Sequence, residues 1–165
     1  MKEAIQTLIT SDKMAHAFEY LKQDEAHTID QQIELVQISS FSPFEEKRAI
    51  RFKELLTEAD LDPVMDEVHN VYAHIHGTGN GPTLYVSAHL DTVFPPETPL
   101  PVKREGTKIY APGIGDDTRG LAEILTLARA IKESGLKPVG DIIIGGNVGE
   151  EVLLNFSFSK TVMAF

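Results

Sequence analysis

The sequence has no cysteine and no tryptophan among its 165 residues. The lack of cysteine excludes disulfides, thiolate metal sites and a cysteine nucleophile, so any metal site must use histidine, aspartate and glutamate. No apolar run approaches the roughly 18 residues that a membrane-spanning helix needs. An acidic residue, Glu3, stands at the start of the chain, which argues against a secretory signal peptide. We therefore expect a cytoplasmic protein with no membrane partner.

Positive charge is also scarce, with 15 lysines and arginines against 25 acidic residues and a net charge of −10. This balance argues against a nucleic-acid partner, because phosphate backbones are bound by clusters of lysine and arginine. The proportions of hydrophobic residues (42%) and charged residues (24%) are typical of a globular chain rather than a disordered one. A chain of this length suits one domain with a buried core.

Three segments before residue 63 repeat apolar residues at helical spacing. The first helix is predicted from residue 12 to about residue 25. The second is predicted to start at residues 28–31 (TIDQ), which form a capping-box sequence. The third is predicted to start at residues 42–45 (SPFE), which offer an N-cap serine, a proline at the first helical position and a glutamate at N3.

Beyond residue 63 the pattern becomes that of strands. Residues 71–76 alternate apolar and polar side chains, which predicts a half-buried strand. Residues 83–88 (TLYVSA) and 141–146 (DIIIGG) are nearly continuous apolar runs, which predict buried interior strands. A strongly amphipathic helix is predicted between them, at residues 118–134. This order predicts an α/β fold with a largely parallel or mixed central sheet and flanking helices.

Two polar features of the strand region have simple interpretations. His74 and His76 share one face of the strand expected at residues 71–76. They could chelate a metal ion, but an exposed and partly paired strand face is the simpler interpretation. The turn at residues 77–82 (GTGNGP) lacks the lysine and the following helix of a phosphate-binding loop. We therefore assign no ligand to either feature from the sequence.

Three short polar clusters stand at the ends of the predicted strands or at the start of the long helix. They are His89 with Asp91, Asp116 with Asp117, and Glu150 with Glu151. Each cluster alone is common on protein surfaces. Their shared placement is informative, because ligands of open α/β sheets bind beyond the carboxyl ends of the strands. Imidazole and carboxylate groups are also the ligands that a metal site without cysteine must use.

Three ordered segments carry a resemblance to a known family. They are residues 84–93 (LYVSAHLDTV), 113–125 (GIGDDTRGLAEIL) and 149–151 (GEE). Together they resemble the signatures of the dizinc aminoacylase and carboxypeptidase superfamily, which includes peptidase T, succinyl-diaminopimelate desuccinylase, acetylornithine deacetylase and glutamate carboxypeptidase. The likeness runs from about residue 29 to residue 151 and favours the peptidase T side of that group.

The resemblance implies a role for each matching residue. His89 would bind one zinc ion and Asp91 would orient its imidazole, while Asp116 would bridge two zinc ions. Glu150 would act as general base and Glu151 would bind the second zinc ion. The implied activity is hydrolysis of the amide bond of a small peptide or an N-acyl amino acid by zinc-activated water. Cobalt or manganese are possible substitutes for zinc.

The sequence departs from this family in its length and its ending. Family members are more than twice as long, and they add a lid or dimerisation domain, a further carboxylate ligand and a last histidine ligand. We therefore assign residues 1–151 to the N-terminal part of a dizinc hydrolase catalytic domain, with the lid domain absent. Residues 152–165 form an atypical apolar tail, with three of the eight phenylalanines and one charge.

The tail suggests a truncated or frame-shifted product, whereas the alternative is a native edge strand. In either case an alternating apolar tail favours self-association. We expect the chain by itself to be inactive as a hydrolase. Two other functions stay open at this point: a related dizinc aminopeptidase, and a non-catalytic binding module that keeps only the sheet.

Overall fold

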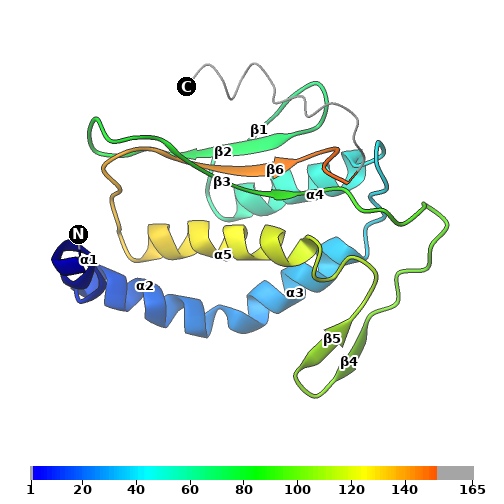
Figure 1. Ribbon diagram of the computed structural model, residues 1–165, viewed down its shortest axis with the longest axis horizontal. Coiled ribbons are helices and arrows are strands. Elements are labelled where there is room, and N and C mark those ends of the chain that lie inside the picture. The colour runs from blue at the N-terminus through cyan, green and yellow to red at the C-terminus, as the bar shows by residue number, and fades with distance from the viewer. Residues whose placement is uncertain (1, 152–165) are drawn as a thin grey trace.

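A four-stranded mixed sheet, covered on one face by helices, forms the centre of the computed structural model, which describes residues 2–151 (Figure 1). The helices are α1 (Lys2–Ile9), α2 (Asp12–Gln23), α3 (Glu25–Val36), α4 (Glu46–Glu58) and α5 (Thr118–Glu133). The strands are β1 (Val64–Met65), β2 (Val71–Ile75), β3 (Leu84–His89), β4 (Lys103–Glu105), β5 (Lys108–Tyr110) and β6 (Ile142–Asn147).

The strand order is β1-β2-β6-β3. Strands β3 and β6 are parallel, and β2 runs antiparallel to both β6 and β1. Helices α4 and α5 lie against the sheet, and α2 and α3 pack on α5 as an outer layer. The predicted α/β fold with a mixed sheet and flanking helices is therefore confirmed. Strands β4 and β5 form a separate antiparallel hairpin that the sequence did not predict.

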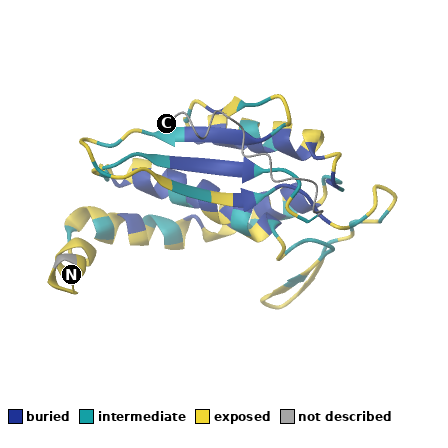
Figure 2. Cartoon of the chain, turned by 45° about the horizontal axis from the view of Figure 1, so that its top comes forward, coloured by how far each residue is buried: buried dark blue, intermediate teal, exposed yellow. Residues whose placement is uncertain are grey.

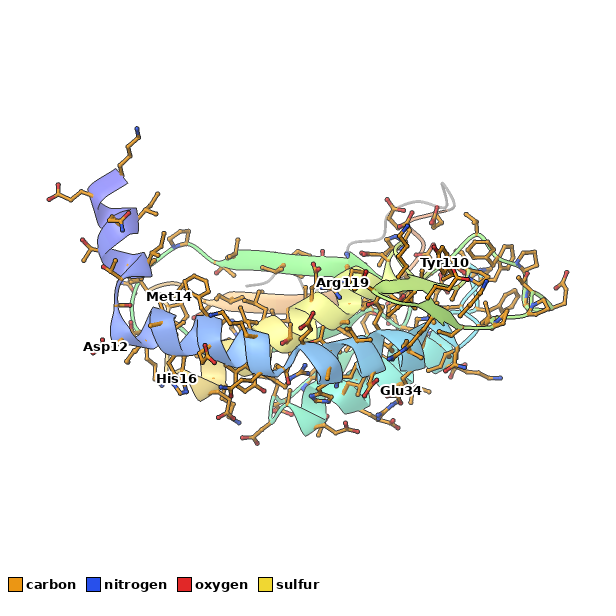
Figure 3. All side chains as sticks on the ribbon, turned by 90° about the horizontal axis from the view of Figure 1, so that it is seen from below. Asp12, Met14, His16, Glu34, Tyr110 and Arg119 are labelled. Atoms are coloured by element: carbon orange, nitrogen blue, oxygen red, sulfur yellow. The ribbon has the colours of Figure 1, made fainter. Side chains whose placement is uncertain are left out.

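The core lies between the sheet and the α4–α5 layer, where Figure 2 shows a continuous buried band. The predicted apolar stripe of α5 is buried there, and its fully buried members are Leu121 and Leu125. They meet Phe52 from α4 and Ile144 from β6, both inaccessible to solvent. Burying a side chain of this size contributes roughly 1.5–3 kcal/mol. The exposed side chains of the outer layer, including His16 and Glu34, project from α2 and α3 (Figure 3).

The prediction that both apolar runs form interior strands is correct for β6 and wrong for β3. Strand β6 lies between β2 and β3, and four of its six residues are buried. Strand β3 is an edge of the sheet in the described part of the chain, and its Leu84 is 56% exposed. An apolar run shows that a strand is hydrophobic, but it does not show how many neighbours that strand has. The carboxyl ends of β3 and β6 still meet, because the two strands are parallel and His89 pairs with Asn147.

Two predicted helix starts are also wrong. Helix α3 begins at Glu25, so Thr28 lies inside it and its hydroxyl donates to the Asp24 carbonyl at 3.0 Å. Helix α4 begins at Glu46, four residues after the expected N-cap Ser42. Helix α1 was not predicted. The expected apolar tail at residues 152–165, with its self-association, lies outside the described residues. Among the helices described, none is both long and apolar enough to cross a bilayer.

Candidate metal centre

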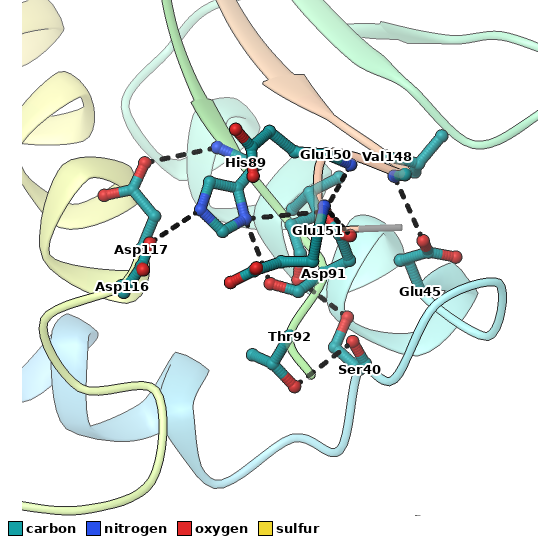
Figure 4. A network of polar contacts seen from close by, with 12 residues as sticks. Ser40, Glu45, His89, Asp91, Thr92, Asp116, Asp117, Val148, Glu150 and Glu151 are labelled. Atoms are coloured by element: carbon teal, nitrogen blue, oxygen red, sulfur yellow. Dashed lines mark hydrogen bonds and ion pairs between the residues drawn. The ribbon is translucent and has the colours of Figure 1, made fainter. Parts of the chain in front are cut away.

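The three polar clusters come together at the carboxyl end of the β3–β6 pair (Figure 4). His89 is the last residue of β3, and the Glu150–Glu151 pair follows β6. Asp117 is the N-cap of α5, and its Oδ1 accepts a hydrogen bond of 3.0 Å from the Gly120 N–H. The parallel pairing of the strands and the start of the helix therefore set the positions of all three clusters.

His89, Asp116 and Glu151 form a group able to hold a metal ion. One ligand atom from each residue lies within 4.8 Å of the other two. The His89 Nε2 atom is 2.8 Å from Asp116 Oδ1. One imidazole and two carboxylates match the three protein ligands that a catalytic zinc ion usually has. The donor set therefore fits the metal that the sequence implied, and the predicted convergence of these three residues is present.

Asp91 faces the other nitrogen of the His89 ring. Nδ1 of His89 lies 3.1 Å from the Asp91 carbonyl oxygen and 3.4 Å from the Asp91 carboxylate. Asp91 is completely buried, so this contact is protected from water. A carboxylate or carbonyl beside the second nitrogen of a histidine ligand fixes its tautomer and the direction of its ring. This is the arrangement that the sequence predicted for Asp91.

The Asp91 carboxylate has a second set of contacts that the sequence analysis missed. Its Oδ1 accepts the Glu150 N–H at 3.1 Å, and its Oδ2 accepts the Glu151 N–H at 2.9 Å. Burial opposes the charge of this carboxylate, but the His89 contact and the two N–H groups outweigh burial and hold the Asp91 pKa below its usual value. Asp91 is therefore an anion that ties the Glu150–Glu151 segment to the end of β3.

The site concentrates negative charge around His89. Burial lowers the pKa of the His89 ring, but the contacts with Asp91 and Asp116 outweigh it and raise that pKa to about 9. Desolvation and the charge of Asp116 raise the pKa of Glu151. Burial likewise raises the pKa of Asp117. Carboxylates brought this close favour a cation between them, because a positive charge relieves their mutual repulsion.

Three further residues position this site. Asp117 Oδ2 accepts a hydrogen bond of 3.2 Å from the backbone N–H of His89. The Arg48 guanidinium is buried under the site, and its Nη1 donates to the Leu90 carbonyl at 2.8 Å. Glu45, also buried, accepts the Gly149 N–H at 3.2 Å. Arg48 lies four residues before Phe52 on the apolar face of α4, and a charged residue in that position was the signal that could have identified it.

Glu150 completes the set of residues singled out from the sequence, and Arg119 follows Asp117 by two residues on α5. The Glu150 side chain is exposed at the rim of the site, beside Glu151. The Arg119 guanidinium contacts side chains of α5 and α3. It donates to Glu123 at 2.7 Å and to Gln32 at 3.4 Å. Arg119 therefore contributes to the packing of α5 on α3 rather than to the metal group.

Comparison with known proteins agrees with this geometry. Residues 70–158, more than half of the chain, match peptidase family M28. The chain belongs to this family. Carboxypeptidase G2 from Pseudomonas sp. (strain RS-16) is 38% identical over 84 residues, which are 50% of this chain and 20% of that protein. The predicted membership of a metallopeptidase superfamily is thus confirmed.

Solved structures of two peptidases share the fold of the chain. An aminopeptidase PepT from Bacillus cereus matches with a TM-score of 0.65 and 26% identity, over 76% of this chain and 36% of that one. A tripeptidase from Staphylococcus aureus matches with a TM-score of 0.63 and 31% identity, over 76% of this chain and 37% of that one. The chain therefore spans little more than a third of the length of these structures.

Proposed function

We propose that the protein is a zinc-dependent hydrolase of the amide bond in small peptides or N-acyl amino acids. The observation that carries the proposal is the convergence of His89, Asp116 and Glu151 within 4.8 Å at the carboxyl ends of two parallel strands. Membership of a peptidase family supports the reaction class. The names of the similar proteins, a carboxypeptidase, an aminopeptidase and a tripeptidase, support a peptide-like substrate.

Each residue of the site has a defined task in this proposal. In a complete dizinc domain His89 would hold one zinc ion, Glu151 the other and Asp116 would serve both, whereas in this chain the three would share a single ion. Asp91 would keep the His89 ring in the orientation that ligation needs. A zinc ion bound there would supply a lowered pKa for water and an electrophile for the amide carbonyl. Glu150 would accept a proton from the attacking water and return it to the leaving amine. Its exposed carboxylate at the rim is accessible to substrate and solvent.

The number of ligands limits what this chain does by itself. The described residues bring together three ligand groups at this site, and a single catalytic zinc ion requires three protein ligands. A second ion sharing Asp116 would need further donors. We therefore propose that residues 1–151 are part of a dizinc catalytic domain and that the isolated chain binds one ion at this site and, without the second ion of that domain, has little or no activity.

Zinc titration of the purified chain tests the metal site directly. His89→Ala, Asp116→Asn and Glu151→Gln each remove one ligand and should weaken zinc binding by more than the roughly 10–100-fold that losing a supporting partner costs. Glu3→Gln, which neutralises an exposed carboxylate on α1 at the other end of the molecule (Figure 1), should leave affinity unchanged. Equal binding in all four variants would show that zinc does not occupy this group.

A substrate panel tests the reaction class. Dipeptides and tripeptides with free amino termini, the same peptides N-acetylated, and N-acyl amino acids distinguish an aminopeptidase from an aminoacylase or carboxypeptidase. Zinc-dependent cleavage of any of these substrates that is lost in His89→Ala supports the proposed reaction. The same panel is applied to a chimera that carries residues 70–151 within the Staphylococcus aureus tripeptidase. If zinc binds tightly at the site but neither this chain nor the chimera cleaves any substrate, a non-catalytic binding module is favoured instead.

A further inference from the structure

A second group of metal-ligating side chains lies at the opposite end of the sheet. It consists of His74, His76 and Asp141, and one ligand atom from each lies within 4.8 Å of the other two. The His74 and His76 rings have centroids 4.3 Å apart. His74 Nε2 lies 3.0 Å from Asp141 Oδ2. Two imidazoles and a carboxylate therefore share one small region at the surface of the sheet.

The pairing of β2 with β6 brings the three residues together. Residues 74 and 76 are two apart on an extended segment, so their side chains lie on the same face. Because β2 and β6 are antiparallel, with Ile75 opposite Ile142, Asp141 comes next to His76 at the start of β6. The six residues of β6 span roughly 17 Å at about 3.3 Å per residue. That length separates this group from the His89 site.

Backbone contacts hold the group in place without a metal ion. Asp141 Oδ1 accepts the Gly77 N–H at 2.6 Å, which fixes the carboxylate. The turn after His76 is held by Thr78 and Gly79, whose N–H groups each donate over 2.9 Å to the carbonyls of residues 138 and 139. A Cβ on Gly77 would lie 2.6 Å from the Gly140 backbone, so the two segments pack as closely as glycine allows.

The donor set indicates which ions the group would accept. Zinc binds histidine nitrogen at about 2.0–2.1 Å and carboxylate oxygen at about 2.0–2.2 Å, which puts tetrahedral ligands roughly 3.3 Å apart. Ligand atoms that lie within 4.8 Å of one another need to move closer by about 1.5 Å at most, and the exposed His76 side chain is able to move. Magnesium and calcium prefer ligand sets made wholly of oxygen. The Gly77 N–H above all, and then the two histidines, hold the pKa of Asp141 below its usual range, so it is an anion at neutral pH.

We propose that His74, His76 and Asp141 form a second transition-metal site, of the zinc type, which ties the end of β2 to the start of β6. We assign the site a structural role, because it joins two strands and lies far from the residues assigned to hydrolysis; water would complete the four ligands that zinc prefers. Bound zinc stabilises the folded chain, since the three ligands are brought together only when β2 and β6 pair. This inference does not depend on the function proposed for the His89 site.

Equilibrium dialysis against zinc in a His89→Ala background tests the second site alone. This variant should retain one zinc ion per chain, and its melting temperature should rise when zinc is added but not when magnesium is added. Adding His76→Ala should weaken that binding by more than about 10–100-fold, since a direct ligand is lost. Adding His16→Ala instead removes an exposed histidine of α2 and should change nothing.

Copper(II) binding identifies the coordinating atoms independently. The electron paramagnetic resonance spectrum of the His89→Ala chain should show two coordinated imidazole nitrogens, and His76→Ala should reduce them to one. If the His89→Ala chain takes up no zinc, or if His76→Ala and His16→Ala behave alike, the proposal is wrong and His74 and Asp141 form an ion pair only. Zinc binding by the His76→Ala variant with His89 intact measures the His89 site alone. Loss of zinc binding at one site is therefore distinguishable from loss at the other.

Discussion

The backbone N–H of Glu151 donates a 2.9 Å hydrogen bond to the buried carboxylate of Asp91. The same carboxylate faces His89 Nδ1 at 3.4 Å. Asp91 therefore acts on two of the three residues proposed to hold zinc, one through its ring and the other through its backbone. This connects the loop after β6 to the end of β3 across the candidate metal centre.

We predict that Asp91→Asn weakens both zinc binding and the fold. The amide offers one acceptor oxygen where the carboxylate accepts two N–H groups, so a buried donor is left unpaired at a cost of about 1–3 kcal/mol. Asp91→Asn removes the negative charge beside His89 Nδ1 but leaves the Asp91 carbonyl at 3.1 Å, so zinc affinity should fall by up to roughly 10–100-fold. Urea denaturation and zinc titration measure the two effects, with the exposed Asp62→Asn as control. Unchanged zinc affinity in Asp91→Asn would exclude an orienting role for the Asp91 carboxylate.

We predict that Glu150→Gln separates metal binding from turnover. Glu150 holds its place through its backbone N–H, so replacing its carboxylate should leave zinc affinity nearly unchanged. Removal of a general base typically lowers the rate about 10²–10⁴-fold. Turnover of the best substrate at saturating zinc, in this chain or in the tripeptidase chimera, measures the effect. Glu151→Gln is the contrasting variant, since it should lose zinc first. Normal turnover in Glu150→Gln would show that another group takes the proton.

Strands β2, β3 and β6 and the residues of the candidate metal centre could be predicted because their signals are local. Residues 142–147 are an apolar run followed by two glutamates, and α5 carries a regular apolar stripe behind a pair of aspartates. The sheet order could not be predicted in the same way. Leu84 and Ile144 belong to similar apolar runs, yet one is 56% exposed and the other is fully buried. That difference depends on which strands pair, and so on contacts far apart in the sequence.

The residues that support the site were missed for a related reason. Arg48 and Glu45 belong to α4 and its N-cap, more than 40 residues before the groups that they contact at Leu90 and Gly149. Neither belongs to a short motif. Their roles appear only when α4 packs under the carboxyl end of the sheet. A charged side chain on an apolar helix face shows that some buried partner exists, but it does not show which one.

We predict that Asp24 makes the stability of the chain sensitive to acid. Its buried carboxylate joins the outer helices to α5, with Arg129 Nη2 and Thr126 Oγ1 both at 2.6 Å. Burial alone would raise the Asp24 pKa, but the contacts with Thr126 and Arg129 outweigh it and lower the pKa. Because the Asp24 pKa is lowered in the folded state, the ionised carboxylate stabilises the fold at pH values above about 4, the ordinary aspartate pKa. This stabilisation is lost as the pH falls through the lowered pKa of the folded state.

Urea denaturation at a series of pH values between 7 and 3 measures this effect, with the fold monitored by circular dichroism. Asp24→Asn should be less stable at pH 7, by roughly 3–5 kcal/mol if the Arg129 charge is left unpaired. It should also lose less stability than the native chain as the pH falls. Asp12→Asn, at the exposed start of α2, should keep the native pH dependence. If the free energies of unfolding of Asp24→Asn and the native chain change with pH in parallel, the prediction is wrong.

We predict finally that Arg48→Met destabilises the chain and loosens the metal centre. The Arg48 side chain is inaccessible to solvent, and it donates to the carbonyls of Leu90 at 2.8 Å and Ile38 at 2.7 Å. Methionine fills a similar volume but donates nothing, so the Ile38 carbonyl loses its Arg48 donors, while Leu90 keeps only the Ser40 hydroxyl at 2.7 Å. A buried acceptor left without its donor costs about 1–3 kcal/mol.

The effect on zinc should be smaller than that of Asp91→Asn, because Arg48 reaches the site only through Asp91, by its charge and by its hydrogen bond to the neighbouring Leu90 carbonyl. Arg48→Lys should recover part of the stability, since one ammonium cannot reproduce the fork of a guanidinium that spans two carbonyls. Lys47→Met, on the exposed face of the same helix, should change the free energy of unfolding by less than about 0.5 kcal/mol. Equal stability of Arg48→Met and Lys47→Met would show that the buried guanidinium contributes nothing to the fold beneath the metal centre.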